Sequence, residues 1–205
     1  MPHWEVPRLS LKAVPDWERL PPLPPFRLAD GGGFSRHPTA VRLAWDEAAL
    51  HVRFDCTDHD AWGTFTRRDD PIYQEEAVEV FLAPGDADPV RYFELEVSPR
   101  GTLFDAIVLN PDSDRATMQV DTAWDCPDLL WEAGVGEASQ DWWAKLAIPW
   151  RGLLPTGPLP TTWRANFYRI ERPRGEPAEW SAWSPTWSHP ADFHKPAWFG
   201  RLTLV

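Results

Sequence analysis

The sequence predicts an all-β fold, an antiparallel β-sandwich of the immunoglobulin or jelly-roll type with only a few short helical turns. Two observations carry this prediction: apolar and polar residues alternate in several short runs, and 23 of the 205 residues are proline. Alternation with a period of two places successive side chains on opposite faces of a strand. Proline interrupts helices, so its frequency favours short strands joined by turns.

The predicted strands follow one another at short intervals along the chain. Residues 41–45 and 50–56 alternate on either side of a turn at 46–49, which is the pattern of a hairpin. The same alternation predicts six further strands: 77–84, 91–99, 101–109, 141–150, 163–172 and 200–205. A short helical turn is expected near 151–154.

One domain is expected at this length. Residues 1–40 include the proline-rich segment PDWERLPPLPP and the turn sequence ADGGGF. We expect them to form an extended N-terminal segment packed on the domain, with regular structure starting only afterwards. Residues 41–205 form the sandwich.

The net charge is −11, from 20 Lys and Arg against 31 Asp and Glu. This balance argues against nucleic acid as a partner, because phosphate backbones are bound by clustered basic residues. No run approaches the roughly 18 apolar residues of a membrane span, so no membrane partner is expected. The first residues lack the basic and apolar regions of an export signal, which gives a cytoplasmic location as the default expectation.

Two cysteines occur, Cys56 and Cys126, without the spacing of a metal site. Two buried thiols are expected. A single bridge between them stays open, because the sequence does not place their Cα atoms.

Three glutamates fall on the face of the predicted sheet that does not form the core. Alternation places Glu79 in one strand, and Glu94 and Glu96 in the next, opposite the apolar positions. Three interpretations stay open: a solvated sheet face, hydrogen bonding to a sugar, or paired carboxylates that act as acid and base.

Aromatic residues are concentrated in stretches that carry no strand period. The chain has 14 tryptophans, more than a core of this size needs. Rings on loops are platforms for the C–H face of a sugar, although they can also cap an open end of the core. The candidates are Tyr73, Trp180, Trp183, Trp187, Phe193 and Trp198.

Aspartates in loops are weak candidates for a structural calcium site, because calcium prefers oxygen ligands. The pattern of an EF-hand is absent, and turn residues or helix caps are the alternative. The candidates are Asp58, Asp60, Asp69 and Asp70. No motif for an organic cofactor occurs, and none is expected.

Several segments, read together, resemble carbohydrate-binding module family 9 within the DOMON-like β-sandwiches. The resemblance covers residues 41–205 and rests on the order of these motifs: DDPIYQEEAVEVFLAP, RYFELEVSPRG, WWAKLAIPW, WRANFYRIE, WSAWSP and HKPAWFGRLTLV.

The resemblance implies a shallow concave site in which two aromatic rings clamp a terminal sugar, the reducing end of a β-glucan or xylan. The clamp positions fall on Tyr73 and Phe193, and the strand glutamate of the family falls on Glu79. Glu94 stands where sugar-binding members often have a basic residue. The resemblance also implies structural calcium ions.

We therefore expect non-catalytic carbohydrate binding in which Tyr73 and Phe193 stack on the sugar. The expected partner is an oligosaccharide or polysaccharide, together with a separately encoded glycoside hydrolase. The residues expected to hydrogen-bond the sugar are Glu79, Glu94, Glu96, Asn166 and Arg169, and further binding candidates are Trp183, Trp187 and His194.

Two other functions stay open. A glycoside hydrolase would act through Glu79 with Glu94 or Glu96. A haem-binding sandwich, as found in related families, would take its axial ligands from Met118, His194 or Lys195.

Overall fold

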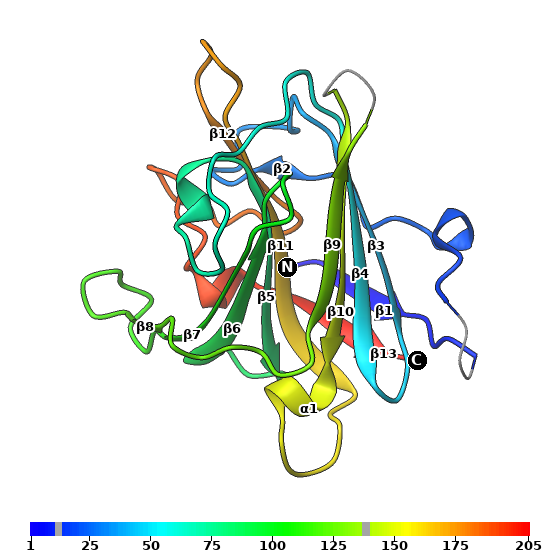
Figure 1. Ribbon diagram of the computed structural model, residues 1–205. Helices are drawn as coiled ribbons and strands as arrows, with labels where there is room; N and C mark the ends of the chain where they lie inside the picture. Colours follow the sequence, from blue (N-terminus) through cyan, green and yellow to red (C-terminus); the bar gives the residue numbers. More distant parts are fainter. Residues whose placement is uncertain (11–13, 137–139) are drawn as a thin grey trace.

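Two β-sheets pack face to face in the computed structural model, which describes residues 1–10, 14–136 and 140–205 (Figure 1). The predicted all-β sandwich is confirmed. None of the helices in these residues is long and apolar enough to cross a membrane.

The larger sheet has nine strands, in the order β1-β13-β11-β5-β6-β7-β8, and β12 and β2 extend it beside β11. All pairs in it are antiparallel except β1 with β13, which is parallel. Its strands are β1 (His3–Val6), β2 (Arg27–Leu28), β5 (Ala77–Pro84), β6 (Arg91–Val97), β7 (Leu103–Leu109), β8 (Gln119–Asp121), β11 (Thr162–Glu171), β12 (Glu179–Ala182) and β13 (Gly200–Leu204).

The smaller sheet has four antiparallel strands in the order β3-β4-β10-β9. They are β3 (Thr39–Trp45), β4 (Ala49–Cys56), β10 (Trp142–Pro149) and β9 (Leu130–Val135). The helical elements are short: α1 (Trp150–Leu153) and the 3-10 helices Trp17–Arg19, Ile72–Gln74 and Pro196–Trp198.

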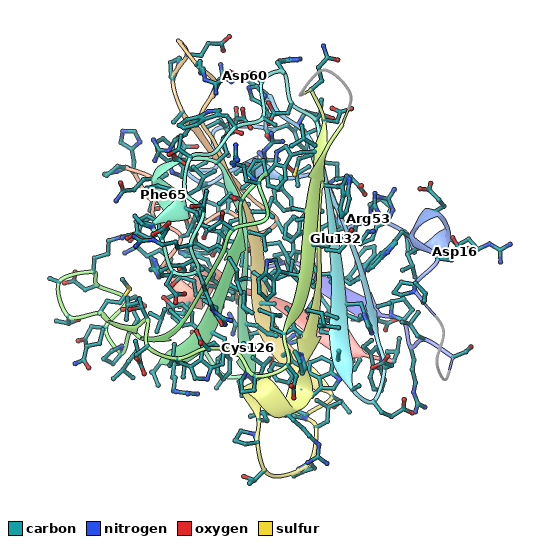
Figure 2. All side chains as sticks on the ribbon, in the orientation of Figure 1. Asp16, Arg53, Asp60, Phe65, Cys126 and Glu132 are labelled. Atoms are coloured by element: carbon teal, nitrogen blue, oxygen red, sulfur yellow. The ribbon has the colours of Figure 1, made fainter. Side chains whose placement is uncertain are left out.

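The main core lies between the two sheets, where Figure 2 shows side chains filling the space. The alternating apolar residues of the strands form this core: Val78, Val80 and Leu82 of β5 point into it. Aromatic rings join the layers, as in the edge-on contact of Phe54 with Phe167 at 6.2 Å between ring centroids. Burial of this apolar surface is the main source of stability.

The other face of the larger sheet is also covered. Phe81, Tyr92 and Tyr168 on this face pack with Phe193 and Phe199 from the chain that leads into β13. Side chains on the outer face of β5 and β6 are therefore buried, and the interpretation of the glutamates as a solvated sheet face, one of the three that the sequence left open, is wrong. The chain around Phe193 and Phe199, which is distant in sequence, covers this face and excludes water from it.

All eight predicted strands are present, with boundaries that differ by up to two residues. The alternation did not reveal β1, β2, β8, β9 and β12. These strands are short or, like β9, carry mainly exposed side chains, so they lack a strong period. Because β1 and β2 lie within residues 1–40, the expectation that regular structure starts after this segment is wrong.

Cys56 and Cys126 are both buried and free, so no bridge joins them. Burial raises the pKa of each thiol to about 12. Both side chains belong to the main core, as two buried thiols were expected to.

Candidate functional site

A pocket of about 340 Å³ opens on the outer face of the larger sheet. Pockets for small ligands enclose about 300–1,000 Å³, so this one has room for a small ligand. It is lined by Tyr73, Glu79, Glu94, Glu96, Phe104, Arg115, Met118, Val120, Thr122, Ile170, Trp180, Ala191, Phe193 and His194.

The floor of the pocket is formed by three glutamates on β5 and β6. Glu79 lies directly opposite Glu96 in the register of the two strands. Glu94 precedes Glu96 by two positions and so shares its face. One oxygen of each carboxyl group lies within 4.8 Å of the others. The sequence therefore correctly placed all three on one face, and the fold joins them in one cluster.

Burial raises the pKa of all three carboxyl groups. Burial raises the pKa of Glu94 to about 7 against the opposing charge of Arg115. Burial first, and then repulsion by the neighbouring carboxylates, raise the pKa values of Glu79 and Glu96 well above the usual range. Glu96 is fully buried, and neither of its oxygens has a hydrogen-bond partner among the described residues. The cluster thus holds protons or takes a partner from outside.

Basic groups at the pocket do not neutralise this floor. Arg115 is half-exposed and donates to Asp192 at 2.8 Å. His194 lies 3.8 Å from Glu94, but burial first, and then Arg115, lower the pKa of its imidazole to about 3. His194 is therefore neutral near pH 7.

Aromatic side chains form the walls. Tyr73, in the 3-10 helix Ile72–Gln74, packs edge-on against Phe104 with 5.6 Å between ring centroids. Phe193 stacks on Tyr168 at 4.1 Å with 14° between the ring planes. Trp180 on β12 completes this apolar surround. The two clamp positions that the resemblance implied both line the pocket.

The segment that carries Phe193 and His194 is fixed by hydrogen bonds to the sheet. Tyr168 donates its hydroxyl to the Phe193 carbonyl at 2.9 Å. Tyr92 Oη lies 2.8 Å from His194 Nδ1, and Asn110 donates to the His194 carbonyl at 3.0 Å. The wall is therefore held by three strand or strand-end residues before any ligand arrives.

Asn166 and Arg169 do not reach the pocket. Asn166 is fully buried and binds the Ser184 backbone through both its amide oxygen and its amide nitrogen. Arg169 lies an odd number of positions away on β11, so it points to the opposite face. There it pairs with Asp58 and Glu171. The hypothesis that both residues bind sugar at this pocket does not agree with their positions.

Three of the candidate tryptophans, Trp183, Trp187 and Trp198, also lie outside the pocket. Trp183 is buried in the main core against Phe167. Trp187 is 56% exposed, and its ring lies 6.3 Å from that of Trp198. Of the haem candidates, Met118 and His194 line the pocket, whereas Lys195 pairs with Asp192 at 3.0 Å.

Several pocket residues were not identified as site residues from the sequence. Phe104 lies on β7, whose alternation could have placed it beside Glu96, its partner in register. Arg115, Val120 and Thr122 come from the segment around β8, where the sequence carries no period. Trp180 stood among the loop aromatics, and its place on β12 brings it to the wall.

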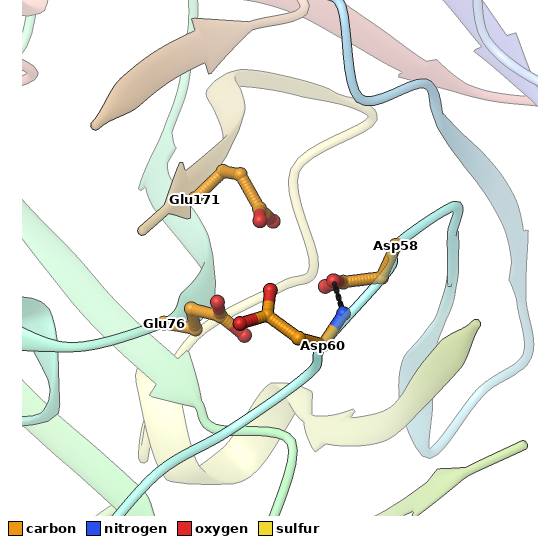
Figure 3. Close-up of side chains that lie close together, drawn as sticks. All are labelled: Asp58, Asp60, Glu76 and Glu171. Carbon is orange, nitrogen blue, oxygen red and sulfur yellow. Dashed lines mark hydrogen bonds between the residues drawn. The ribbon is translucent and has the colours of Figure 1, made fainter. Parts of the chain in front are cut away.

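A second acidic cluster lies at one end of the sandwich (Figure 3). Carboxyl oxygens of Asp58, Asp60, Glu76 and Glu171 lie within 4.8 Å of one another and point to a common centre. Within the described part of the chain, Glu76 Oε1 and Glu171 Oε1 are buried without a hydrogen-bond partner. Four carboxyl groups, two of which have an unpartnered oxygen, supply the hard oxygen donors that calcium prefers.

The other two calcium candidates lie apart from this cluster. Asp69 is near Asp105 and Asp125, where Arg68 already pairs with the last two. Asp70 accepts the backbone N–H of Arg67 at 2.9 Å and so closes a turn. Asp70 thus has the turn role that was the alternative to calcium.

The sandwich and its pocket define a β-sandwich ligand-binding domain. The model of carbohydrate-binding family 9 matches residues 33–204, most of the chain. The chain therefore belongs to this family, as the resemblance implied, and it is a carbohydrate-binding domain.

Other proteins are similar to this chain in sequence or in fold. A protein from Arthroderma benhamiae named "Extracellular protein" is 25% identical over 176 residues, which cover 82% of this chain and 78% of that protein. A proposed carbohydrate-binding protein from Bacteroides uniformis is 17% identical, with a TM-score of 0.74 and coverage of 99% of both chains.

A family 9 module from Caldicellulosiruptor kristjanssonii shares the fold as well. Its complex with glucose has a TM-score of 0.65 at 16% identity and covers 100% of this chain and 96% of the module. Its complex with cellotriose has a TM-score of 0.64 at 15% identity, with coverage of 99% and 93%.

Proposed function

We propose that the pocket binds the terminal, reducing-end unit of a β-glucan-type or xylan-type oligosaccharide without cleaving it. The observation that carries this proposal is the pairing of aromatic walls with a carboxyl floor in one pocket. Tyr73 and Phe193 offer faces for the C–H surface of a pyranose. The floor offers hydrogen-bond partners for its hydroxyls.

The fold neighbours from Caldicellulosiruptor kristjanssonii, solved with glucose and with cellotriose, support this ligand class. Affinity should be modest, because a small pocket buries little surface and its hydrogen bonds replace those to water. Such a domain would act together with a separately encoded glycoside hydrolase by binding the polysaccharide that the enzyme cleaves.

The test is calorimetric titration with cellobiose and xylobiose, each beside its borohydride-reduced alditol. Reduction opens only the terminal ring, so it isolates the reducing end. Binding of the parent sugars that disappears on reduction supports the proposal. Equal binding of sugar and alditol overturns reducing-end recognition, and absence of binding by all four overturns the ligand class.

Glycoside hydrolysis is the rival function, favoured by the pKa of Glu94 near 7 beside two other carboxyl groups. One oxygen of each carboxyl group lies within 4.8 Å of the others, which is below the separation of about 6.5–9.5 Å in inverting enzymes and close to the separation of about 5–5.5 Å in retaining enzymes. A panel of aryl glycosides decides between the two. Release of the aryl group that Glu94→Gln abolishes would establish the rival.

We propose in addition that calcium binds among Asp58, Asp60, Glu76 and Glu171 and stabilises this end of the sandwich. Binding to the folded state alone raises the melting temperature. We expect Tm to rise on adding calcium and to fall in chelator, and Glu76→Gln to remove the difference. An equal Tm in calcium and chelator would overturn this site.

A further inference from the structure

The floor of the pocket holds more carboxyl groups than a neutral sugar needs. Three carboxyl groups meet there, and Glu96, which is fully buried and lines the pocket, has no hydrogen-bond partner outside this carboxyl cluster in the described part of the chain. Buried polar groups are normally satisfied, so two orphaned oxygens in a ligand pocket point to a donor that the ligand supplies.

Several elements contribute charged and titratable groups around the three glutamates. These groups are Tyr73, Tyr92, Arg115, Tyr168, Asp192, His194 and Lys195. Arg115 and Lys195 both pair with Asp192. His194 is neutral, because its imidazole is buried. The basic groups at the pocket thus pair with Asp192 or are neutral, so a ligand can supply a cation for the three glutamates.

A protonated amine matches this floor in both charge and hydrogen bonding. An ammonium group has three donors and no acceptor, whereas ionised carboxylates only accept. Charge-assisted hydrogen bonds of this kind are roughly twice as strong as neutral ones. Glu94 adds a third carboxyl group to the floor beside Glu79 and Glu96, and a bound cation would favour their ionised form.

We propose that this pocket selects a sugar that carries a protonated amine, a hexosamine unit with a free amino group. This inference rests on the proposed carbohydrate-binding function and names its ligand class. The amine lies over Glu79, Glu94 and Glu96, and the pyranose ring lies between Tyr73 and Phe193.

A divalent cation alone fits this pocket less well. Calcium takes about six to eight oxygen ligands, and the neighbours of the glutamates on the same face are apolar. Phe81 and Ala106 flank Glu94 in register, and Phe104 flanks Glu96. Aromatic walls at Tyr73 and Phe193 also have no part in binding a bare ion. An amino sugar uses both the floor and the walls.

The test compares glucosamine, glucose and N-acetylglucosamine by calorimetric titration of the full chain near pH 6.5, followed by calcium chloride alone. Glucose lacks the amine, and N-acetylglucosamine keeps the nitrogen without its charge. We expect glucosamine to bind at least about tenfold more tightly than either neutral sugar. Because the amine favours ionised carboxylates, binding should also release protons, and the heat should therefore differ between two buffers of different ionisation enthalpy.

Glu94→Gln and Glu96→Gln, which keep the side-chain size, should reduce the preference for glucosamine about tenfold each. The matched control is Glu132→Gln on β9, an exposed glutamate on the other sheet, labelled in Figure 2, and it should leave the preference unchanged. Near-ultraviolet circular dichroism checks that each variant is folded.

The outcomes separate the two proposals. Glucose binding as tightly as glucosamine overturns amine selection and leaves carbohydrate binding intact. Calcium binding that Glu96→Gln removes, with no sugar bound, overturns both. A glucosamine preference that survives both floor variants overturns the assignment of the amine to these carboxylates.

Discussion

Glu79 on β5 lies directly opposite Glu96 on β6, so a strand pair buried on both faces brings two carboxyl groups together. Like charges at directly opposed positions destabilise a sheet. Water would screen this repulsion on an exposed face, but here both residues are almost fully buried. Protons relieve the repulsion at low pH, which makes the floor of the pocket sensitive to pH.

We expect the contribution of the glutamate cluster to the stability of the protein to fall as the pH rises from about 4 to about 7. A glutamate in the unfolded chain titrates near pH 4.3, whereas the pKa of Glu94 in the folded protein is about 7. The folded state therefore binds more protons over this range, and its advantage is complete below the lower value and lost above the higher one. Urea unfolding between pH 4 and pH 8 measures this slope.

Glu96→Gln removes one ionisable group and should flatten this dependence, so that the variant exceeds the wild type in stability at pH 8. Glu132→Gln changes the same charge on an exposed strand and should retain the wild-type slope. A wild-type stability with the same dependence on pH as that of Glu96→Gln would contradict the protonated cluster.

Tyr73→Ala should weaken binding of the preferred sugar about tenfold and leave stability nearly unchanged, because Tyr73 is 41% exposed at the pocket wall. Trp131 on β9 is a matched aromatic, 38% exposed on the other sheet, so Trp131→Ala should leave affinity unchanged. Titration calorimetry measures both variants. Equal losses of affinity in the two variants would contradict the site.

Phe193→Ala should cost stability as well as affinity. Its ring is 5% exposed and stacks on Tyr168, and deleting a buried phenylalanine costs about 3–5 kcal/mol. Phe193→Leu keeps most of the volume and should separate the two effects, with a smaller loss of stability but the same loss of affinity. Chemical unfolding and sugar titration of both variants check this. Full affinity in folded Phe193→Leu would remove Phe193 from the clamp.

Arg169→Met should destabilise the fold by about 3–5 kcal/mol, because it leaves Asp58 and Glu171 buried without their cation. Arg19→Met, at an exposed ion pair with Asp16, should have almost no effect. The measurement is urea unfolding. Arg169→Lys keeps the charge, and the folded protein should bind sugar like the wild type. Loss of sugar binding in folded Arg169→Lys would indicate that Arg169 belongs to the sugar-binding site.

Cys56 and Cys126 should not react with a thiol reagent in the native protein. Both are buried, and a pKa near 12 leaves very little thiolate at neutral pH. Colorimetric titration should detect both thiols only after unfolding in guanidinium chloride without a reductant. Fewer than two thiols in the unfolded protein would indicate a bridge that the structure does not contain.

Local alternation predicted the faces of the strands well, because the side-chain period of a strand is a local property. It brought Glu79, Glu94 and Glu96 to one face. It also carried the information that Asn166 and Arg169 point to opposite faces of one strand, and the hypothesis that both bind the same sugar overlooked this.

What covers a face is a long-range property, and alternation does not encode it. Phe193 and His194 come from the far end of the chain to lie over β5 and β6, so carboxylates expected in solvent are buried. Likewise, Glu76 and Glu171 meet Asp58 and Asp60 only through the fold. Short strands such as β8 and β12 were missed because their hydrogen bonds to longer neighbours define them.

The chain passes directly from Phe193 and His194 through the 3-10 helix Pro196–Trp198 into β13. That strand lies between β1 and β11, and the Pro2 carbonyl accepts the backbone N–H of Arg201 at 3.0 Å. The segment that lines the pocket is thus short, and the strand that follows it is paired with the first residues of the protein. One wall of the pocket and the N-terminal strand are therefore joined through β13, although they come from opposite ends of the sequence.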